Sequence, residues 1–109
     1  MTQTIEKHTP GGIEHVRWMA PETFDPRIGS TNSDIWSFAM VMYELLAGND
    51  PYYEFAMFTV IAKVAGGVTP SRPRTIDNDK IWDLMKDCWI LMPTERPPIQ
   101  EVIRRLDNF

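Results

Sequence analysis

The sequence has 109 residues, of which 43% are hydrophobic and 24% charged, and its net charge is −4 with a pI of about 5.0. A chain of this length forms at most one domain with one modest core. Its basic residues are scattered, which argues against a nucleic-acid interface and a polybasic membrane patch. The single cysteine, Cys88, cannot form a disulfide within the chain, and the N-terminus has no apolar core of the signal-peptide type. We therefore expect a soluble, cytoplasmic protein.

The first part of the chain is predicted to be loop. Residues 1–16 are mostly polar, contain the turn-forming run Pro10-Gly11-Gly12 and show no sustained apolar period. Residues 18–24 are long enough for one helical turn, and residues 25–30 form a loop. We expect a flexible arm over residues 1–13 and one domain over residues 14–109.

The stretch Asp34–Leu46 is predicted to be the central helix. Only three of its residues are polar, and its apolar side chains point in almost every direction around a helix. Such a helix lies either deep in a protein or in a membrane, and this one is too short for a membrane, where a span needs ~20 apolar residues. Thr31 and Asp34 resemble a capping box at its start, and Gly48 is placed to end it. Because 109 residues are few for enclosing it, one side of this helix is expected to face solvent.

Three further helices are predicted, each with an apolar face at the i, i+3, i+4, i+7 spacing. The second covers residues 54–65, the third begins after residue 77 or 78 and ends before Pro93, and the last has Pro97-Pro98 in its first turn. Their expected inward residues are Phe58, Ile61, Ala62 and Ala65; Ile81, Leu84, Met85 and Cys88; and Ile99, Val102, Ile103 and Leu106. No strand pattern or internal repeat is visible, so the predicted fold class is all-α, with four main helices around the central apolar one and a short helix after Ala20-Pro21-Glu22.

Several short motifs follow one another in a fixed order. Residues 18–22 read W-M-A-P-E and residues 33–39 read S-D-I-W-S-F-A. The later members of the series are Pro51-Tyr52, V-x-x-G-x-x-P-x-R-P over residues 64–73, Cys88-Trp89, Pro93 and Arg96-Pro97. Because these motifs follow one another in this order, the chain resembles the protein kinase family, and it is most similar to the tyrosine-kinase-like and tyrosine kinase groups. The resemblance covers about residues 14–106, corresponds to the last part of the large helical lobe, and implies that residues 1–13 are the remnant of an activation loop.

The resemblance also implies roles for individual residues. Glu22 would pair with Arg96 and tie the end of the activation segment to the loop between the last two helices. Asp34 would accept hydrogen bonds from the backbone of a catalytic loop. Part of the floor under a protein substrate would be formed by Val16, Arg17 and Trp18.

Without the resemblance, the same residues have plainer interpretations. Glu22 and Arg96 would be surface charges, and Asp34 would be a helix-start carboxylate favoured by the helix dipole. Cys88 lies on an apolar helix face and is expected to be inert, because a reactive thiolate needs positive charge nearby. With or without the resemblance, three tryptophans are expected to lie in the core: Trp36, Trp82 and Trp89.

The sequence lacks the motifs on which phosphoryl transfer depends. It contains no G-x-G-x-x-G, no H-R-D-x-x-x-x-N and no D-F-G, and it has no metal-ligand cluster. We therefore assign no catalytic, cofactor-binding or metal-binding residue. The complete family domain uses ATP and Mg²⁺, but this chain alone is expected to bind neither and to be inactive.

Three interpretations of function remain open. The chain is a fragment of a kinase domain whose family transfers the γ-phosphate of ATP to Ser/Thr or Tyr hydroxyls of proteins; or it is a non-catalytic interaction module or pseudokinase-like remnant; or it is a truncated product without an independent role. Residues 16–18 are nearer to the tyrosine-kinase pattern but leave the acceptor undecided. The expected partner is a protein substrate or another protein, with neither nucleic acid nor membrane, and open apolar surface is expected to favour self-association.

Overall fold

The computed structural model describes residues 13–25 and 27–108, which fold into four α-helices and three short 3₁₀ helices. The α-helices are α2 (Thr31–Ala47), α3 (Met57–Ala65), α4 (Asp79–Cys88) and α5 (Ile99–Asp107), and the 3₁₀ helices are η1 (Ile13–Trp18), η2 (Pro21–Phe24) and η3 (Pro93–Glu95). This part of the chain contains no strand, so the predicted all-α class is confirmed. Among the same residues, no helix combines the length and the apolar character that crossing a membrane requires.

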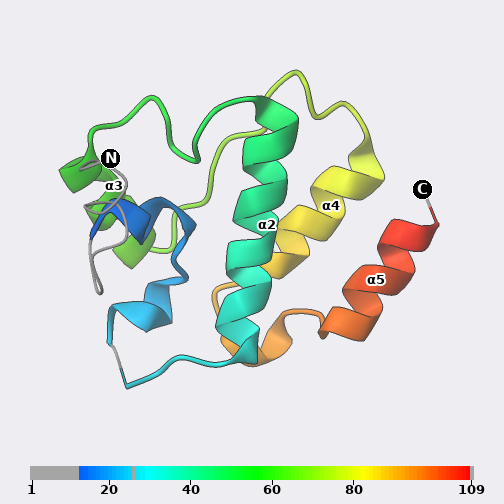
Figure 1. Ribbon diagram of the computed structural model, residues 1–109, viewed down its shortest axis with the longest axis horizontal. Coiled ribbons are helices and arrows are strands. Elements are labelled where there is room, and N and C mark those ends of the chain that lie inside the picture. The colour runs from blue at the N-terminus through cyan, green and yellow to red at the C-terminus, as the bar shows by residue number, and fades with distance from the viewer. Residues whose placement is uncertain (1–12, 26, 109) are drawn as a thin grey trace, which may run out of the picture.

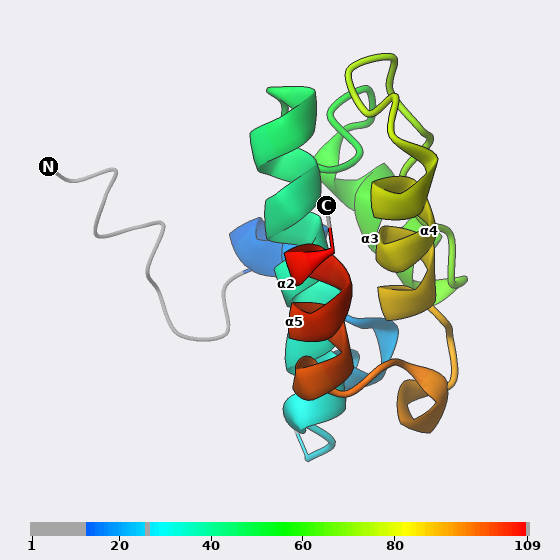
Figure 2. The same ribbon diagram turned by 90° about the vertical axis from the view of Figure 1, so that its right-hand side faces the viewer.

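Helix α2 is the centre of the arrangement. It stands upright in Figure 1, with η1 and α3 on one side and α4 and α5 on the other. In Figure 2, α5 lies in front of α2, on the side nearest the viewer, and α4 lies beside it. Helix α2 packs on η1, η3 and α4, while α3 packs on η1 and α5 packs on α4. The core therefore draws fully buried side chains from every α-helix, including Trp36, Met40, Val60, Val64, Leu84, Met85 and Val102.

The end of α2 was predicted correctly and its start was not. Gly48 follows the helix in the left-handed conformation, with φ of 77°, which glycine adopts without steric cost. At the start, Ser30 is the N-cap, and its carbonyl accepts the amides of Ser33 and Asp34. The expected capping box is wrong, because Thr31 is already helical and an N-cap residue needs an extended backbone.

Helix α3 differs from the prediction in both its start and its inward face. It begins at Met57 because the preceding residues form a turn, in which the Phe55 amide donates to the Tyr52 carbonyl and Tyr52 has a positive φ of 57°. Its buried residues are Val60 and Val64, whereas Phe58, expected to point inward, is 80% exposed. Ala62 and Ala65, the other residues of the predicted stripe apart from half-buried Ile61, are also exposed.

Helix α4 agrees with its prediction, and α5 agrees in part. Asn78 caps α4 by accepting the amides of Lys80 and Ile81, and the expected stripe is inward: Ile81, Leu84, Met85 and Cys88. The prolines precede α5, with Pro98 as its N-cap, because a residue before proline is disfavoured in the helical region. On α5 itself, Val102 is fully buried and Leu106 half-buried, but Ile99 and Ile103 are exposed.

Candidate functional site

Glu22 and Arg96 form a buried ion pair that joins the A-P-E segment to the loop before α5. Two parallel hydrogen bonds connect them, from Nη1 to Oε2 at 2.7 Å and from Nη2 to Oε1 at 3.0 Å. The Arg96 side chain is 0% exposed and the Glu22 side chain 12%. This two-point geometry is the strong form of a carboxylate–guanidinium contact. The structure thus contains the pairing that the resemblance implies, across 74 positions of sequence.

The Arg96 guanidinium also donates hydrogen bonds to main-chain carbonyls. Arg96 donates to the carbonyls of Ile90, Asn32 and Leu91, at 2.8, 2.9 and 3.3 Å. Its guanidinium lies 4.9 Å from the centre of the Trp36 ring. Because these partners belong to the segment after α4 and to α2, the single Arg96 side chain holds three parts of the fold together.

The environment of Glu22 favours its ionised form. Burial raises the pKa of Glu22, but hydrogen bonds from Arg96 and from the Ser33 hydroxyl outweigh it, so that the pKa lies below its usual value of 4.5. The Ser33 Oγ donates to Oε2 at 2.6 Å from the first turn of α2. No motif in the sequence pointed to Ser33 as a partner of Glu22.

Arg17 fixes the turn after α2 against η1. Its guanidinium donates to the carbonyls of Pro51, Tyr52 and Phe55 at 3.0, 2.8 and 2.9 Å. Sequence reasoning placed Arg17 in the substrate floor but missed this contact, since main-chain carbonyls carry no side-chain signal. The guanidinium is therefore engaged in holding the turn beside the predicted floor.

The neighbours of Arg17 anchor η1 to α2. The Trp18 indole donates to Glu44 at 3.1 Å, and the Ser37 hydroxyl donates to the Trp18 carbonyl at 2.7 Å. Val16 is buried in the core. The structure brings the three predicted floor residues together on η1, and their role toward a substrate stays a prediction.

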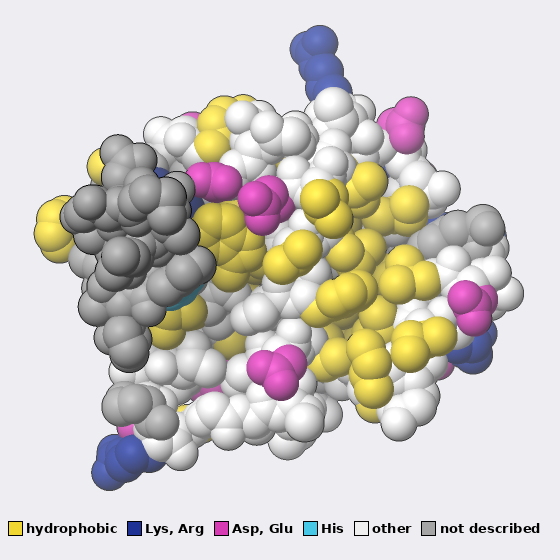
Figure 3. All heavy atoms as spheres, viewed as in Figure 1, with side chains coloured by type: hydrophobic (Ala, Val, Ile, Leu, Met, Phe, Trp, Pro, Cys, Tyr) yellow, Lys and Arg dark blue, Asp and Glu magenta, His cyan; other side chains and the backbone are white. Residues whose placement is uncertain are grey.

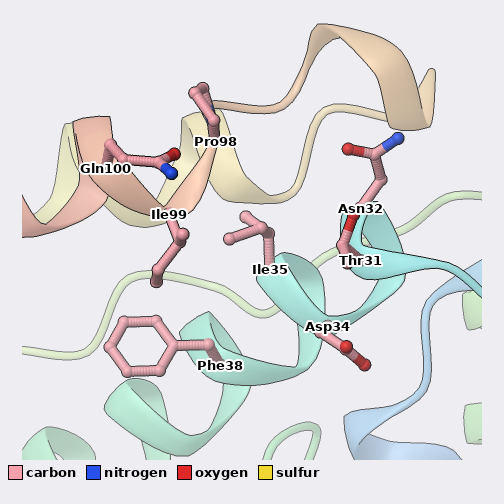
Figure 4. A pocket seen from close by; sticks show the side chains of 8 residues that line it. All are labelled: Thr31, Asn32, Asp34, Ile35, Phe38, Pro98, Ile99 and Gln100. Atoms are coloured by element: carbon pink, nitrogen blue, oxygen red, sulfur yellow. The ribbon is translucent and has the colours of Figure 1, made fainter.

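An open groove of about 640 Å³ lies between the start of α2 and the start of α5. Figure 4 shows Ile35 and Phe38 of α2 and Ile99 of α5 pointing toward one another, while the Asp34 side chain points away from them. The Asp34 carboxylate is exposed and makes no hydrogen bond or ion pair with another described residue. Its role as an acceptor of hydrogen bonds from the backbone of a catalytic loop, which the family resemblance implies, stays a prediction.

The same groove belongs to a wider apolar face. Figure 3 shows hydrophobic side chains gathered over α2 and α5. We call this the α2–α5 face and define it by the exposed residues Phe38, Val41, Leu45, Leu46, Ile99 and Ile103. One side of the central helix thus faces solvent, as predicted from the sequence.

The aromatic core and the cysteine are structural. Trp36 and Trp89 are buried, and Trp82 packs edge-on against Trp89 with ring centres 5.7 Å apart. Neither the Trp36 nor the Trp89 indole nitrogen has a hydrogen-bond partner among the described residues. Cys88 is fully buried, and this burial raises the pKa of its thiol to about 11, which suits an inert side chain.

The described residues offer no metal centre. Within residues 13–25 and 27–108, no group of three or more His, Cys, Asp or Glu side chains could hold a metal ion.

The sequence is similar to known protein kinases. A model of the protein tyrosine and serine/threonine kinase family matches residues 1–106. Fibroblast growth factor receptor 1 of Xenopus laevis and the tyrosine-protein kinase receptor Tie-1 of Danio rerio are each 34% identical over 104 residues, or 94% of this chain. The proto-oncogene tyrosine-protein kinase ROS of Homo sapiens is 36% identical over 99 residues, or 90% of this chain.

The chain spans only part of these relatives: 13% of the Xenopus receptor, 55% of Tie-1 and 4% of ROS. The match nevertheless covers almost all of this chain, including both members of the Glu22–Arg96 pair. The chain belongs to the protein tyrosine and serine/threonine kinase family.

Proposed function

We propose that this chain forms the helical base of a protein kinase domain that transfers the γ-phosphate of ATP to a tyrosine hydroxyl of a protein. The observation that carries the proposal is the Glu22–Arg96 pair, which joins the A-P-E segment to the loop before α5 within a chain matched by the family over residues 1–106. Tyrosine as the acceptor is supported by the names of the relatives Tie-1 and ROS, both tyrosine-protein kinases, and by the pattern of residues 16–18.

The part of this chain in the reaction is positioning. Arg17 and Trp18 fix η1 against the turn after α2 and against Glu44, and the Glu22–Arg96 pair fixes η2. A substrate segment lying on η1 would therefore meet a preorganised surface, which lowers the entropic cost of binding. The sequence contains none of the motifs that hold ATP and Mg²⁺ in this family, so in this proposal the chemistry of transfer is supplied by groups other than those of the helices described here.

A chimera tests the proposal. The part of the human ROS kinase domain that precedes its matched region is joined to this chain, and the product is given ATP, Mg²⁺ and two peptides, one with tyrosine and one with serine as acceptor. We expect phosphate on the tyrosine peptide, and we expect the isolated chain to give no calorimetric signal with Mg·ATP. Nucleotide binding by the chimera serves as the control for folding. A chimera that binds ATP but phosphorylates neither peptide would contradict the proposal.

A second function is favoured by the α2–α5 face. This face leaves six large apolar side chains exposed, and apolar patches of this kind mark interaction sites in soluble domains. The chain on its own would then act as a non-catalytic interaction module. Saturable binding of a partner protein to the chain, abolished by Leu45→Glu and without any requirement for nucleotide, would favour this function over the first.

A further inference from the structure

The chain contains three tyrosines, and only one of them is exposed to solvent. Tyr43 and Tyr52 are each 2% exposed, and burial raises the pKa of both hydroxyls. Tyr52 also donates its hydroxyl to the Val68 carbonyl at 2.7 Å. Tyr53, by contrast, is 58% exposed. An enzyme that acts on tyrosine hydroxyls of the folded chain is therefore expected to reach Tyr53 and neither of the others.

Tyr53 and Glu54 form the tip of the turn between α2 and α3. The Phe55 amide donates to the Tyr52 carbonyl at 2.9 Å, which closes the turn around these two residues. Tyr52 has a positive φ of 57°, a conformation that is uncommon for a bulky side chain. Its burial in the core and the hydroxyl bond to Val68 hold it there. The two adjacent tyrosines thus have opposite environments, with one ring in the core and the other in solvent.

The turn is fastened on both sides of its tip but not at the tip itself. Arg17 donates to the carbonyls of residues 51, 52 and 55. Neither Tyr53 nor Glu54 forms a hydrogen bond, through its main chain or its side chain, with another residue of the described ranges. The tip can therefore adjust to an enzyme while the bonds on either side stay formed. Exposed loop tips are also where proteases gain access to folded chains most readily.

Charges of both signs lie on or against this turn. Asp50 and Glu54 supply two carboxylates. Two cations contact the turn: the Arg17 guanidinium, bonded to its carbonyls, and Lys63, whose ammonium lies 4.4 Å from the centre of the Phe55 ring. These four charges sum to zero. A phosphate on Tyr53 would add a charge of about −1.5 to −2 and would turn a balanced segment into a negative one.

We propose that Tyr53 is a phosphorylation site of this chain, modified by a tyrosine kinase with ATP as the donor. The Tyr53 hydroxyl oxygen forms a bond to the γ-phosphorus of ATP, the bond from that phosphorus to the oxygen it shares with the β-phosphorus breaks, and the hydroxyl proton is released. The products are phosphotyrosine and ADP. Tyr53 acts only as the acceptor. Because the kinase is a separate enzyme, this proposal does not rest on the proposed function.

Mass spectrometry of the intact chain after treatment with a tyrosine kinase tests the proposal. The enzyme is one that phosphorylates a free peptide of residues 48–59 carrying Tyr52→Phe, so that it accepts the sequence around Tyr53. We expect one phosphate per folded chain, which fragmentation locates on Tyr53. The chain unfolded in urea and diluted into the assay at once should also take phosphate on Tyr52. A folded chain that stays unmodified, or that carries as much phosphate on Tyr52 as on Tyr53, would overturn the proposal.

Matched variants confirm the acceptor. Tyr53→Phe should abolish phosphate incorporation and leave the fold intact, because the side chain is exposed and the substitution removes only its hydroxyl. Tyr43→Phe removes the hydroxyl of a buried tyrosine and should leave incorporation unchanged. Circular dichroism checks that both variants are folded. Undiminished incorporation in folded Tyr53→Phe would show that the acceptor is another residue and that the proposal is wrong.

Discussion

Arg96 is the residue on which the described structure depends most. Its guanidinium is fully buried and is shared between the Glu22 carboxylate, three main-chain carbonyls and the face of Trp36. A buried cation is tolerated only when its donors are paired, and here the partners come from segments far apart in the sequence. Removing the side chain therefore releases several connections at once.

Replacing Arg96 by Ala should lower the free energy of unfolding by ~3–5 kcal/mol, because the Glu22 carboxylate loses its counterion in a largely buried site. Arg104→Ala is the matched control: Arg104 pairs with Glu101 in a comparable geometry but on the surface, where solvent screens the pair. Urea unfolding followed by circular dichroism measures both variants. Equal effects of the two substitutions would show that burial of the Glu22–Arg96 pair contributes nothing.

Glu22 should make the stability of the chain depend on pH. Its pKa in the folded protein lies below 4.5, since the hydrogen bonds from Arg96 and Ser33 exceed the effect of burial. A depressed folded pKa adds stability that is fully present above the unfolded pKa and is lost as the pH falls through the folded one. The stability difference between the parent chain and Glu22→Gln should thus be constant above pH 4.5 and shrink in more acidic solution. Urea titrations across this range measure it, and a difference that does not change with pH would contradict this assignment.

At the level of single residues, the sequence predicted the site unevenly. The Glu22–Arg96 pair was accessible only through the family resemblance, because no local pattern relates positions 74 residues apart. The contacts of Arg17 were not accessible at all, since its partners are main-chain carbonyls of a turn whose geometry the sequence does not show. Ser33 was missed for a similar reason, because its hydroxyl reaches a carboxylate on another element.

At the level of helices, the inward face was predicted correctly only where the apolar residues of the helix lie on a single side. Helix α4 separates apolar from charged residues cleanly, so its inward stripe and its Asn78 cap were predicted correctly. Helix α3 is apolar on two sides, and both Phe58–Ala65 and Met57–Val64 contain residues at i, i+3, i+4 and i+7. Packing on η1 selects the valine side, which only the tertiary structure reveals.

This orientation of α3 is testable by paired substitutions. Val60→Ala should lower the free energy of unfolding by ~1–3 kcal/mol, because Val60 is fully buried and its removal leaves a cavity. Phe58→Ala should change it by less than ~0.5 kcal/mol, as expected for an exposed side chain. Chemical unfolding of both variants under the same conditions gives the comparison. A larger effect of Phe58→Ala would favour the face predicted from the sequence.

At the level of the whole molecule, the core is too small to cover all the apolar side chains of the central helix. Helix α2 buries Trp36, Met40 and Tyr43 on one side and leaves Phe38, Val41 and Leu45 exposed on the other. Helix α5 adds Ile99 and Ile103 to the same exposed face, and a groove separates the two helices at their starts. A chain near this size hides only roughly 60–70% of its unfolded surface. The helix that organises the fold is therefore enclosed on one side only.

The isolated chain should consequently bind a hydrophobic dye and self-associate through the α2–α5 face. Exposed apolar surface attracts such dyes, and patches beyond a few hundred Å² mark interfaces or aggregation. The double variant Leu45→Glu with Ile103→Glu should reduce dye fluorescence and shift the sedimentation of the chain toward the monomer. It should leave the thermal unfolding transition nearly unchanged, because both side chains are exposed: Leu45 at 77% and Ile103 at 52%. Phe58→Glu changes a residue of α3, which lies on the other side of α2 from α5, and should alter neither association nor sedimentation. A parent chain that is monomeric, unfolds sharply and does not bind the dye would mean that the solvent-exposed side of α2 does not cause association.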